Sequence, residues 1–162
     1  MELIEPTLRM EIAMKGIFIW GVLASIIWVL VACSDKLDVK QEYDYTFSTW
    51  YLPKTVRMGE AVEIRFTLER SGNYEDAAYY IGYTQIEGEG VVFDQNGFLL
   101  VNRETHALED MAALDKSNWQ KWIFTLFYRP MAGNKSEVRF VIIDNFGQEK
   151  QLSVSFTVKE NE

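Results

Sequence analysis

Residues 60–70 read Glu-Ala-Val-Glu-Ile-Arg-Phe-Thr-Leu-Glu-Arg, and this stretch decides the fold of the chain. Apolar side chains at positions 62, 64, 66 and 68 alternate with charged or polar ones at 63, 65, 67 and 69. A strict period of two predicts a β-strand with one buried and one solvated face. Gly59 before it and Ser71-Gly72-Asn73 after it are turn residues that bound the strand.

Further strands are predicted on both sides of this one, rich in aromatic and β-branched residues and separated by turn signals. They cover Tyr43–Tyr51, Ala77–Ile86, Val91–Phe93, Phe98–Val101, Trp119–Tyr128, Glu137–Asp144 and Leu152–Val158. Trp119–Tyr128 is apolar at most positions, which predicts burial on nearly both faces. The pattern predicts an all-β fold, an immunoglobulin-like antiparallel β-sandwich of seven or eight strands.

Two loops have turn chemistry of their own. Asp94-Gln95-Asn96-Gly97 predicts a tight hairpin, in which the Asn-Gly pair supplies positive φ values. Asp144-Asn145-Phe146-Gly147-Gln148 predicts a second hairpin, with Gly147 at positive φ and Asp144 or Asn145 bonded to the turn backbone. Phe146 is unusual at such a tip, so it either folds onto the end of the sandwich or is offered to a partner.

The stretch from Glu104 to Leu114 has two interpretations, a short helix or a loop. As a helix, it has Thr105 as its cap and turns Leu108, Met111 and Ala112 inward.

The N-terminal part contains an uncharged apolar run from Gly16, preceded by Lys15 and ended by Leu30-Val31-Ala32-Cys33. This arrangement resembles the end of a bacterial lipoprotein signal peptide, which implies cleavage before Cys33 and acylation of its thiol. Two or three acyl chains make a stable anchor, at ~0.8 kcal/mol per buried methylene. A retained transmembrane helix and a structural cysteine are the alternatives. With either a lipoprotein signal peptide or a retained transmembrane helix, we expect the rest of the chain to lie outside the cytoplasm.

Acidic residues precede Lys15, where a positive region is expected, so we expect translation to start at Met14. The expected organisation is start-site excess over 1–13, a signal peptide over 14–32, a lipidated tether over 33–40 and one sandwich domain over 41–159.

The composition excludes several classes of function. The chain carries 24 Asp and Glu against 16 Lys and Arg, a net charge of −8, which argues against nucleic acid as a partner. The single cysteine allows no intrachain disulfide. His106 is the only histidine, and no phosphate-binding or calcium loop is present, so we expect no metal, no cofactor and no catalysis. The soluble domain is expected to be a monomer.

Several segments taken together resemble the TraQ family of conjugative-transposon lipoproteins, small proteins with a domain of unassigned function. They are the lipobox, Met58–Arg65, Leu68–Gly72, Leu126–Tyr128 and Asp144–Gln148. The similarity extends from about Asp35 to Phe156, although the stretch Thr105–Trp119 is longer than the family pattern. The resemblance implies a part in conjugative DNA transfer and supplies no catalytic residues.

The predicted function is therefore a lipid-anchored, non-enzymatic component or accessory of a conjugative transfer apparatus. Its expected partners are envelope proteins of that apparatus, and its expected location is the outer membrane, facing the periplasm or the cell surface. The candidate contact residues are Asp144, Asn145, Phe146, Gly147 and Gln148. The alternatives are a surface module that binds a glycan or another ligand through exposed aromatic residues and, less favoured, a hydrolase.

Overall fold

A computed structural model describes residues 43–160 of the chain. The expected start-site excess, signal peptide and lipidated tether, with Cys33, all lie outside the described residues. The described part is all-β with one 3₁₀ turn, η1 (Leu108–Asp110). Its seven strands are β1 (Tyr45–Thr49), β2 (Thr55–Arg57), β3 (Val62–Arg70), β4 (Tyr79–Phe93), β5 (Thr105–Ala107), β6 (Lys121–Asp144) and β7 (Glu149–Lys159).

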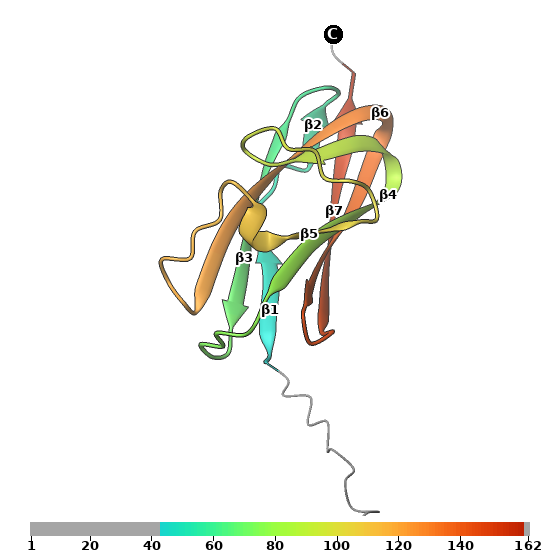
Figure 1. The fold of residues 1–162 in the computed structure, drawn as a ribbon. Coiled ribbons are helices and arrows are strands. Elements are labelled where there is room, and N and C mark those ends of the chain that lie inside the picture. The colour runs from blue at the N-terminus through green and yellow to red at the C-terminus, as the bar shows by residue number, and fades with distance from the viewer. Residues whose placement is uncertain (1–42, 161–162) are drawn as a thin grey trace, which may run out of the picture. The chain divides into compact units, whose positions relative to one another are not determined.

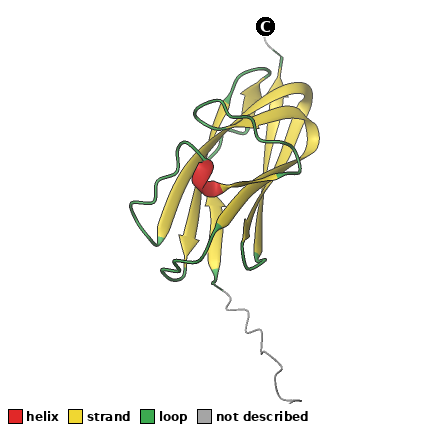
Figure 2. Ribbon diagram, in the orientation of Figure 1, coloured by secondary structure: helices red, strands yellow, loops and turns green. Residues whose placement is uncertain are grey.

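The two long strands, β4 and β6, each pass from one layer of the sandwich to the other (Figure 1). The first part of β6 pairs with β3 and its last part pairs with β7, while β4 pairs with β6 along both parts. One layer is therefore β1-β3-β6-β4 and the other is β5-β4-β6-β7-β2 (Figure 2). All pairs are antiparallel except β2 with β7, which is parallel.

The predicted fold class is confirmed, but strands predicted as separate are continuous. Ala77–Ile86 and Val91–Phe93 belong to β4, and Trp119–Tyr128 and Glu137–Asp144 belong to β6. The register of β4 shifts between Gln85 and Gly90, where the strand bends. A Cβ atom on Gly90 would lie 2.2 Å from the Tyr128 hydroxyl oxygen, so only glycine fits there.

The core lies between the two layers, and the predicted buried face of β3 is confirmed. Phe66 is fully buried, and its ring centroid lies 5.0 Å from that of Phe124 and 4.8 Å from that of Phe140, which belongs to the other layer. At this level of burial each such side chain contributes ~1.5–3 kcal/mol through removal of apolar surface from water. Of the β6 residues expected on a second buried face, Ile123 and Phe127 are half-buried.

The helix considered for Glu104–Leu114 is wrong. The segment forms β5, which pairs with β4, and then the 3₁₀ turn η1. Thr105 lies in the strand and caps nothing, because no side chain caps η1. Leu108 and Met111 are buried as expected, whereas Ala112 is exposed.

The hairpin at Asp94–Gly97 exists with a different turn. Gly97 has a φ of 83° but Asn96 has none in the positive range, so the pair does not form the double positive-φ turn. Of Phe98–Val101, Leu99 makes an isolated bridge to Phe93 and Leu100 donates its N–H to Val92, rather than forming a strand.

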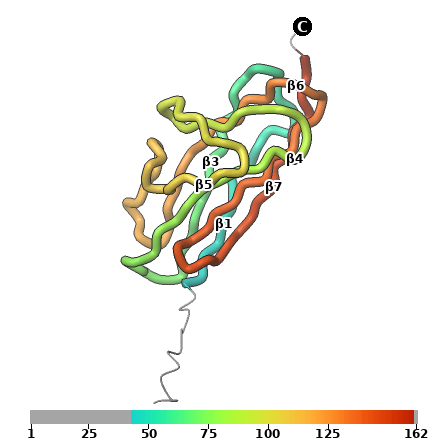
Figure 3. The backbone as a smooth tube through the Cα atoms, turned by 45° about the vertical axis from the view of Figure 1, so that its right-hand side comes forward, coloured from blue at the N-terminus to red at the C-terminus, as the bar shows by residue number. Residues whose placement is uncertain are grey.

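The described domain begins and ends at opposite ends of the sandwich (Figures 1 and 3). β1 starts at the end that also holds the loop between β3 and β4 and the turn between β6 and β7. β7 finishes at the other end, beside β2. We call these the entry end and the distal end.

Candidate functional site

The turn predicted as a contact site, Asp144–Gln148, lies at the entry end and is built around a buried carboxylate. Asp144 is 3% exposed, and its Oδ1 accepts hydrogen bonds from the N–H groups of Phe146 (3.0 Å) and Gln148 (2.7 Å). Gly147 has a φ of 86° and donates its N–H to the Asp144 carbonyl at 3.1 Å. The predicted local turn is thus present, with Asp144 closing it from inside.

Asn145 and Gln148 hold this turn to its neighbours. The Asn145 side chain accepts from the N–H of Ala78 (2.9 Å) and donates to the carbonyl of Asp76 (2.9 Å). Gln148 donates through Nε2 to the carbonyl of Tyr43 at 3.2 Å. Both side chains are therefore engaged within the domain and fasten the loop after β3 and the start of β1.

Phe146 folds onto the end of the sandwich. It is half-buried, and its ring meets the Tyr43 ring edge-on with centroids 4.7 Å apart. Tyr43 in turn packs on Tyr74, at 3.9 Å between centroids. The sequence left two arrangements open for Phe146, and the structure has the ring folded onto the sandwich rather than free. A contact between the half-exposed ring and a partner stays a prediction.

A buried arginine completes the entry end. Arg70 is 4% exposed, and its Nη atoms donate to the carbonyls of Trp119 (3.2 Å) and Tyr74 (2.6 Å). Its guanidinium carbon lies 4.7 Å from the centre of the Trp122 ring, a cation–π contact. Burial raises the pKa of the neighbouring Tyr79, and Arg70 opposes that rise. This cluster ties the loops together at the ends of β3 and β6.

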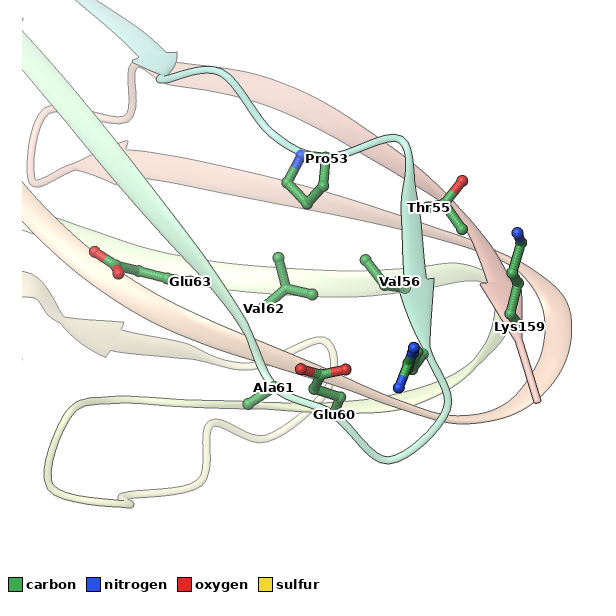
Figure 4. A pocket seen from close by; sticks show the side chains of 9 residues that line it. Pro53, Thr55, Val56, Glu60, Ala61, Val62, Glu63 and Lys159 are labelled. Atoms are coloured by element: carbon green, nitrogen blue, oxygen red, sulfur yellow. The ribbon is translucent and has the colours of Figure 1, made fainter. Parts of the chain in front are cut away.

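The distal end carries an open cleft where the two layers separate (Figure 4). β1 runs beside β3, but the chain then leaves β3 and crosses to β7, where it forms β2. The resulting gap has a volume of about 590 Å³. Its lining residues are Pro53, Thr55, Val56, Arg57, Glu60, Ala61, Val62, Glu63 and Lys159.

A second, smaller hollow of about 320 Å³ adjoins the cleft through Glu63. Trp50 and Tyr51 line it and are 51% and 91% exposed. The Trp50 indole N–H donates to the Thr67 hydroxyl at 3.1 Å, and the Arg65 guanidinium carbon lies 5.1 Å from the ring centre. Trp50 is thus held in place on the outer face of the β1-β3 layer.

Within residues 43–160, no group of three potential ligands could hold a metal ion. No helix in that range is long and apolar enough to cross a bilayer. The imidazole of His106 accepts a hydrogen bond from the N–H of Val101 at 3.2 Å and meets the Phe98 ring edge-on. Both contacts of His106 are with the loop after β4, so this histidine stabilises the loop.

The cleft was missed by sequence reasoning, which placed the candidate contact at the opposite end. Pro53 lies just beyond the point where the chain leaves β3. An exposed Trp50-Tyr51 pair just before that proline is the one sequence signal that points to this end.

Comparison with protein-family models gives a match to the family described as TraQ conjugal transfer protein, over residues 16–159. Comparison with curated proteins gives no match.

Several solved structures are similar to the chain. A lipoprotein from Bacteroides thetaiotaomicron has 29% identity and a TM-score of 0.58, with 76% of this chain and 86% of that chain covered. A conjugative transposon lipoprotein from Bacteroides eggerthii has 28% identity and a TM-score of 0.58, with 71% and 98% covered. A conjugate transposon protein from Bacteroides vulgatus has 26% identity and a TM-score of 0.57, with 76% and 91% covered.

Proposed function

The chain belongs to the TraQ conjugal transfer protein family, and on that premise we propose that it is a lipid-anchored, non-catalytic component of a conjugative-transposon transfer apparatus. The observation that carries the proposal is the family match over residues 16–159, which includes the apolar run and Cys33 as well as the sandwich. Two similar structures are named as a lipoprotein and as a conjugative transposon lipoprotein. Their names support both the lipid anchor and the role in conjugative transfer.

The arrangement of the domain suits a protein that is anchored at one end and binds at the other. Ten Cα–Cα steps lead from Cys33 to Tyr43, and they span at most about 33–36 Å when extended. When Cys33 is acylated, the entry end can therefore lie no farther than about this length from the membrane. The cleft lies at the distal end, where β7 finishes. We propose the outer membrane as the anchoring membrane and envelope proteins of the apparatus as the partners.

Charge supports a protein partner rather than DNA. The net charge of −8 repels the phosphate backbone, whose binding requires a basic surface. The contribution to transfer is therefore the assembly or regulation of the apparatus and not the handling of the DNA strand.

A clean deletion in the donor strain tests this proposal. DNA transfer frequency should fall, and the gene supplied in trans should restore it. A Cys33→Ser gene should restore it poorly, because the protein lacks its anchor. Growth on complex glycans should be unchanged. Normal transfer frequency in the deletion strain overturns the conjugation role.

The second candidate function is glycan binding at the cell surface, favoured by the exposure of Trp50 and Tyr51 beside a hollow. Aromatic side chains that stack on sugars need open ring faces, and Arg65 already lies over the Trp50 ring. A growth defect on complex glycans in the deletion strain, with normal transfer, would favour this function over the first.

A further inference from the structure

The distal cleft exposes a short stretch of strand edge. β6 pairs with β3 from Val62 onward, but β1 pairs with β3 only from Phe66 onward. The last hydrogen bond on the β1 side is from the N–H of Trp50 to the carbonyl of Arg65, at 3.1 Å. Within the part of the chain that the structure describes, β3 therefore has no neighbouring strand beside Val62–Ile64 on that side.

The backbone of Glu63 faces this opening. Successive residues of a strand direct their N–H and C=O groups to alternate sides. Because the Arg65 carbonyl points toward β1, the N–H and C=O of Glu63, two residues earlier, point the same way and into the cleft. Unpaired groups of this kind at a strand edge are a template for pairing with another extended chain.

The cleft beside this edge has an apolar floor. Val56 is 6% exposed and Val62 is half-buried, and Figure 4 shows both side chains on the gap between β2 and β3, with Pro53 beside them. In a strand added opposite Glu63, the residues on either side of the central one point inward, toward these valines. A single Val, Ile or Leu side chain is the group that this floor accommodates.

The lining of the cleft holds two carboxylates, Glu60 and Glu63, and two cations, Arg57 and Lys159. Arg57 and Lys159 lie directly opposite each other in the parallel pairing of β2 with β7, and both are exposed. Neither forms a salt bridge with any residue between 43 and 160. Like charges that face each other across strands are unfavourable, so an acidic side chain placed here gains by relieving that repulsion.

We infer that the distal cleft binds an extended segment of a partner protein that adds as a short strand to the Glu63 edge of β3. The segment places an apolar side chain against Val56 and Val62 and an acidic side chain beside Arg57 and Lys159. Main-chain hydrogen bonds supply affinity and the apolar and charged contacts supply specificity, as in other cases of strand addition. This inference rests on the proposed function, because it names the surface through which the apparatus is contacted.

Photo-crosslinking in donor cells tests the inference on the full chain. Benzoylphenylalanine replaces Glu63 in one strain and Glu69 in a control strain. The two glutamates lie on the same strand and the same face, with side chains 53% and 54% exposed, but β1 covers the edge at Glu69. The expected result is an adduct at position 63 and none at 69, mapped by mass spectrometry to a protein segment with apolar and acidic residues.

Charge reversal supplies the second readout. Arg57→Glu with Lys159→Glu should reduce the adduct by about tenfold or more, because two attractive contacts with the acidic side chain become repulsive. Lys121→Glu, at the entry end of β6, should leave the adduct unchanged. Any one of four results overturns the inference. Two concern the crosslink itself: equal adducts at 63 and 69, or no adduct in cells that transfer DNA. The other two are an adduct mapped to a glycan and an adduct unaffected by charge reversal.

A backbone variant separates the edge contact from the side chain. Glu63→Pro removes the N–H that faces the cleft and spares the β6 ladder, which uses the neighbouring residues. Glu63→Ala keeps that N–H. At equal protein abundance, Glu63→Pro should lower transfer and Glu63→Ala should not.

If deletion lowers transfer while Glu63→Pro matches the wild type, the strand-addition inference fails and the conjugation role stands. If deletion leaves transfer normal but the adduct maps to a segment of the predicted chemistry, the conjugation role fails and the cleft contact stands.

Discussion

Asp94 and Asp144 occupy the same position in two turns that share one hydrogen-bond pattern. Each is 3% exposed and accepts, through Oδ1, the N–H groups of the residues two and four positions later. In each turn the N–H of the glycine three positions later donates to the Asp carbonyl, and that glycine has positive φ. The second carboxylate oxygen fastens a neighbouring group, the N–H of Ala112 for Asp94 and the Gln148 side chain for Asp144.

This pattern predicts that both carboxylates stabilise the fold rather than bind a ligand. Asp144→Ala and Asp94→Ala should each lower the free energy of unfolding by about 1–3 kcal/mol, because the part-buried N–H groups of each turn lose their acceptor. Asn at either position keeps one acceptor oxygen and should cost less. Urea denaturation measures the changes. If Asp144→Ala weakened the partner crosslink at unchanged stability, Asp144 would be a contact residue instead.

Phe66 should be among the costliest core positions. It is fully buried and packs against aromatic rings of both layers. Phe66→Ala should lower the free energy of unfolding by about 3–5 kcal/mol, from lost burial and the cavity that remains. Thr46→Ala, on an exposed position of the adjacent edge strand, is the control and should change it by less than about 0.5 kcal/mol. A loss below about 1 kcal/mol for Phe66→Ala would contradict the observed packing.

The buried face of β3 could be predicted because its apolar residues alternate with charged or polar ones. The face expected to be solvated is not fully so, because Thr67 is 4% exposed and its hydroxyl accepts from the Trp50 indole N–H. The continuity of β4 and β6 could not be predicted, because the bends carry turn-like residues. Gly88 and Gly90 resemble a solvated turn in the sequence, but they allow β4 to cross from one layer to the other beside Tyr128. Likewise Pro130 is a residue that normally ends a strand, yet it lies within β6.

The candidate site was predictable in part. The Asp144–Gln148 turn could be predicted because its residues act on their own local backbone. The cleft could not, because it arises where the chain leaves β3 for β7, a tertiary event with no local motif. The opposition of Arg57 and Lys159 depends on pairing between segments a hundred residues apart in the sequence.

Gly90 should tolerate no side chain. A Cβ atom there would approach the Tyr128 ring to 2.4 Å, and Tyr128 is held by hydrogen bonds to Ser136 and Gln85. Gly90→Ala should therefore destabilise the domain by about 1–3 kcal/mol through overpacking. Gly97→Ala is the comparison for backbone strain alone, since no atom lies within 4 Å of its Cβ position and its φ is 83°. A cost for Gly90→Ala near zero would show that β4 shifts freely at the bend.

Alkaline pH should destabilise the folded domain. Burial, followed by the nearby Asp144 carboxylate, raises the pKa of Tyr45, and burial also raises those of Tyr79 and Tyr83, above the ordinary value of 10.0. Above pH 10 the folded state therefore binds more protons than the unfolded state. The stabilisation is fully present below that pH and is lost as pH rises through the folded-state pKa values.

Thermal unfolding midpoints at pH 9 and pH 11, with phenolate absorbance recorded alongside, measure this loss. The midpoint should fall between the two pH values, and the buried tyrosines should ionise together with unfolding. Tyr51→Phe, at a position that is 91% exposed, should leave the loss unchanged. Ionisation of all eight tyrosines in a still-folded domain would contradict the effect of burial.

Cys33 should carry the lipid. The basic residue Lys15, the uncharged apolar run and Leu30-Val31-Ala32 before the cysteine predict cleavage after Ala32 and acylation of the thiol. One acyl chain gives only marginal membrane binding, so two or three chains are expected on the mature protein. Intact-mass spectrometry of protein extracted from membranes should show a chain that begins at Cys33 with added acyl mass.

Cys33→Ser should leave an unlipidated precursor. Ser34→Ala, at the next position, should be processed as the wild type is, because it leaves the thiol in place. A full-length mass without lipid in the wild-type protein would instead favour a retained membrane helix and would remove the lipid anchor from the proposed function.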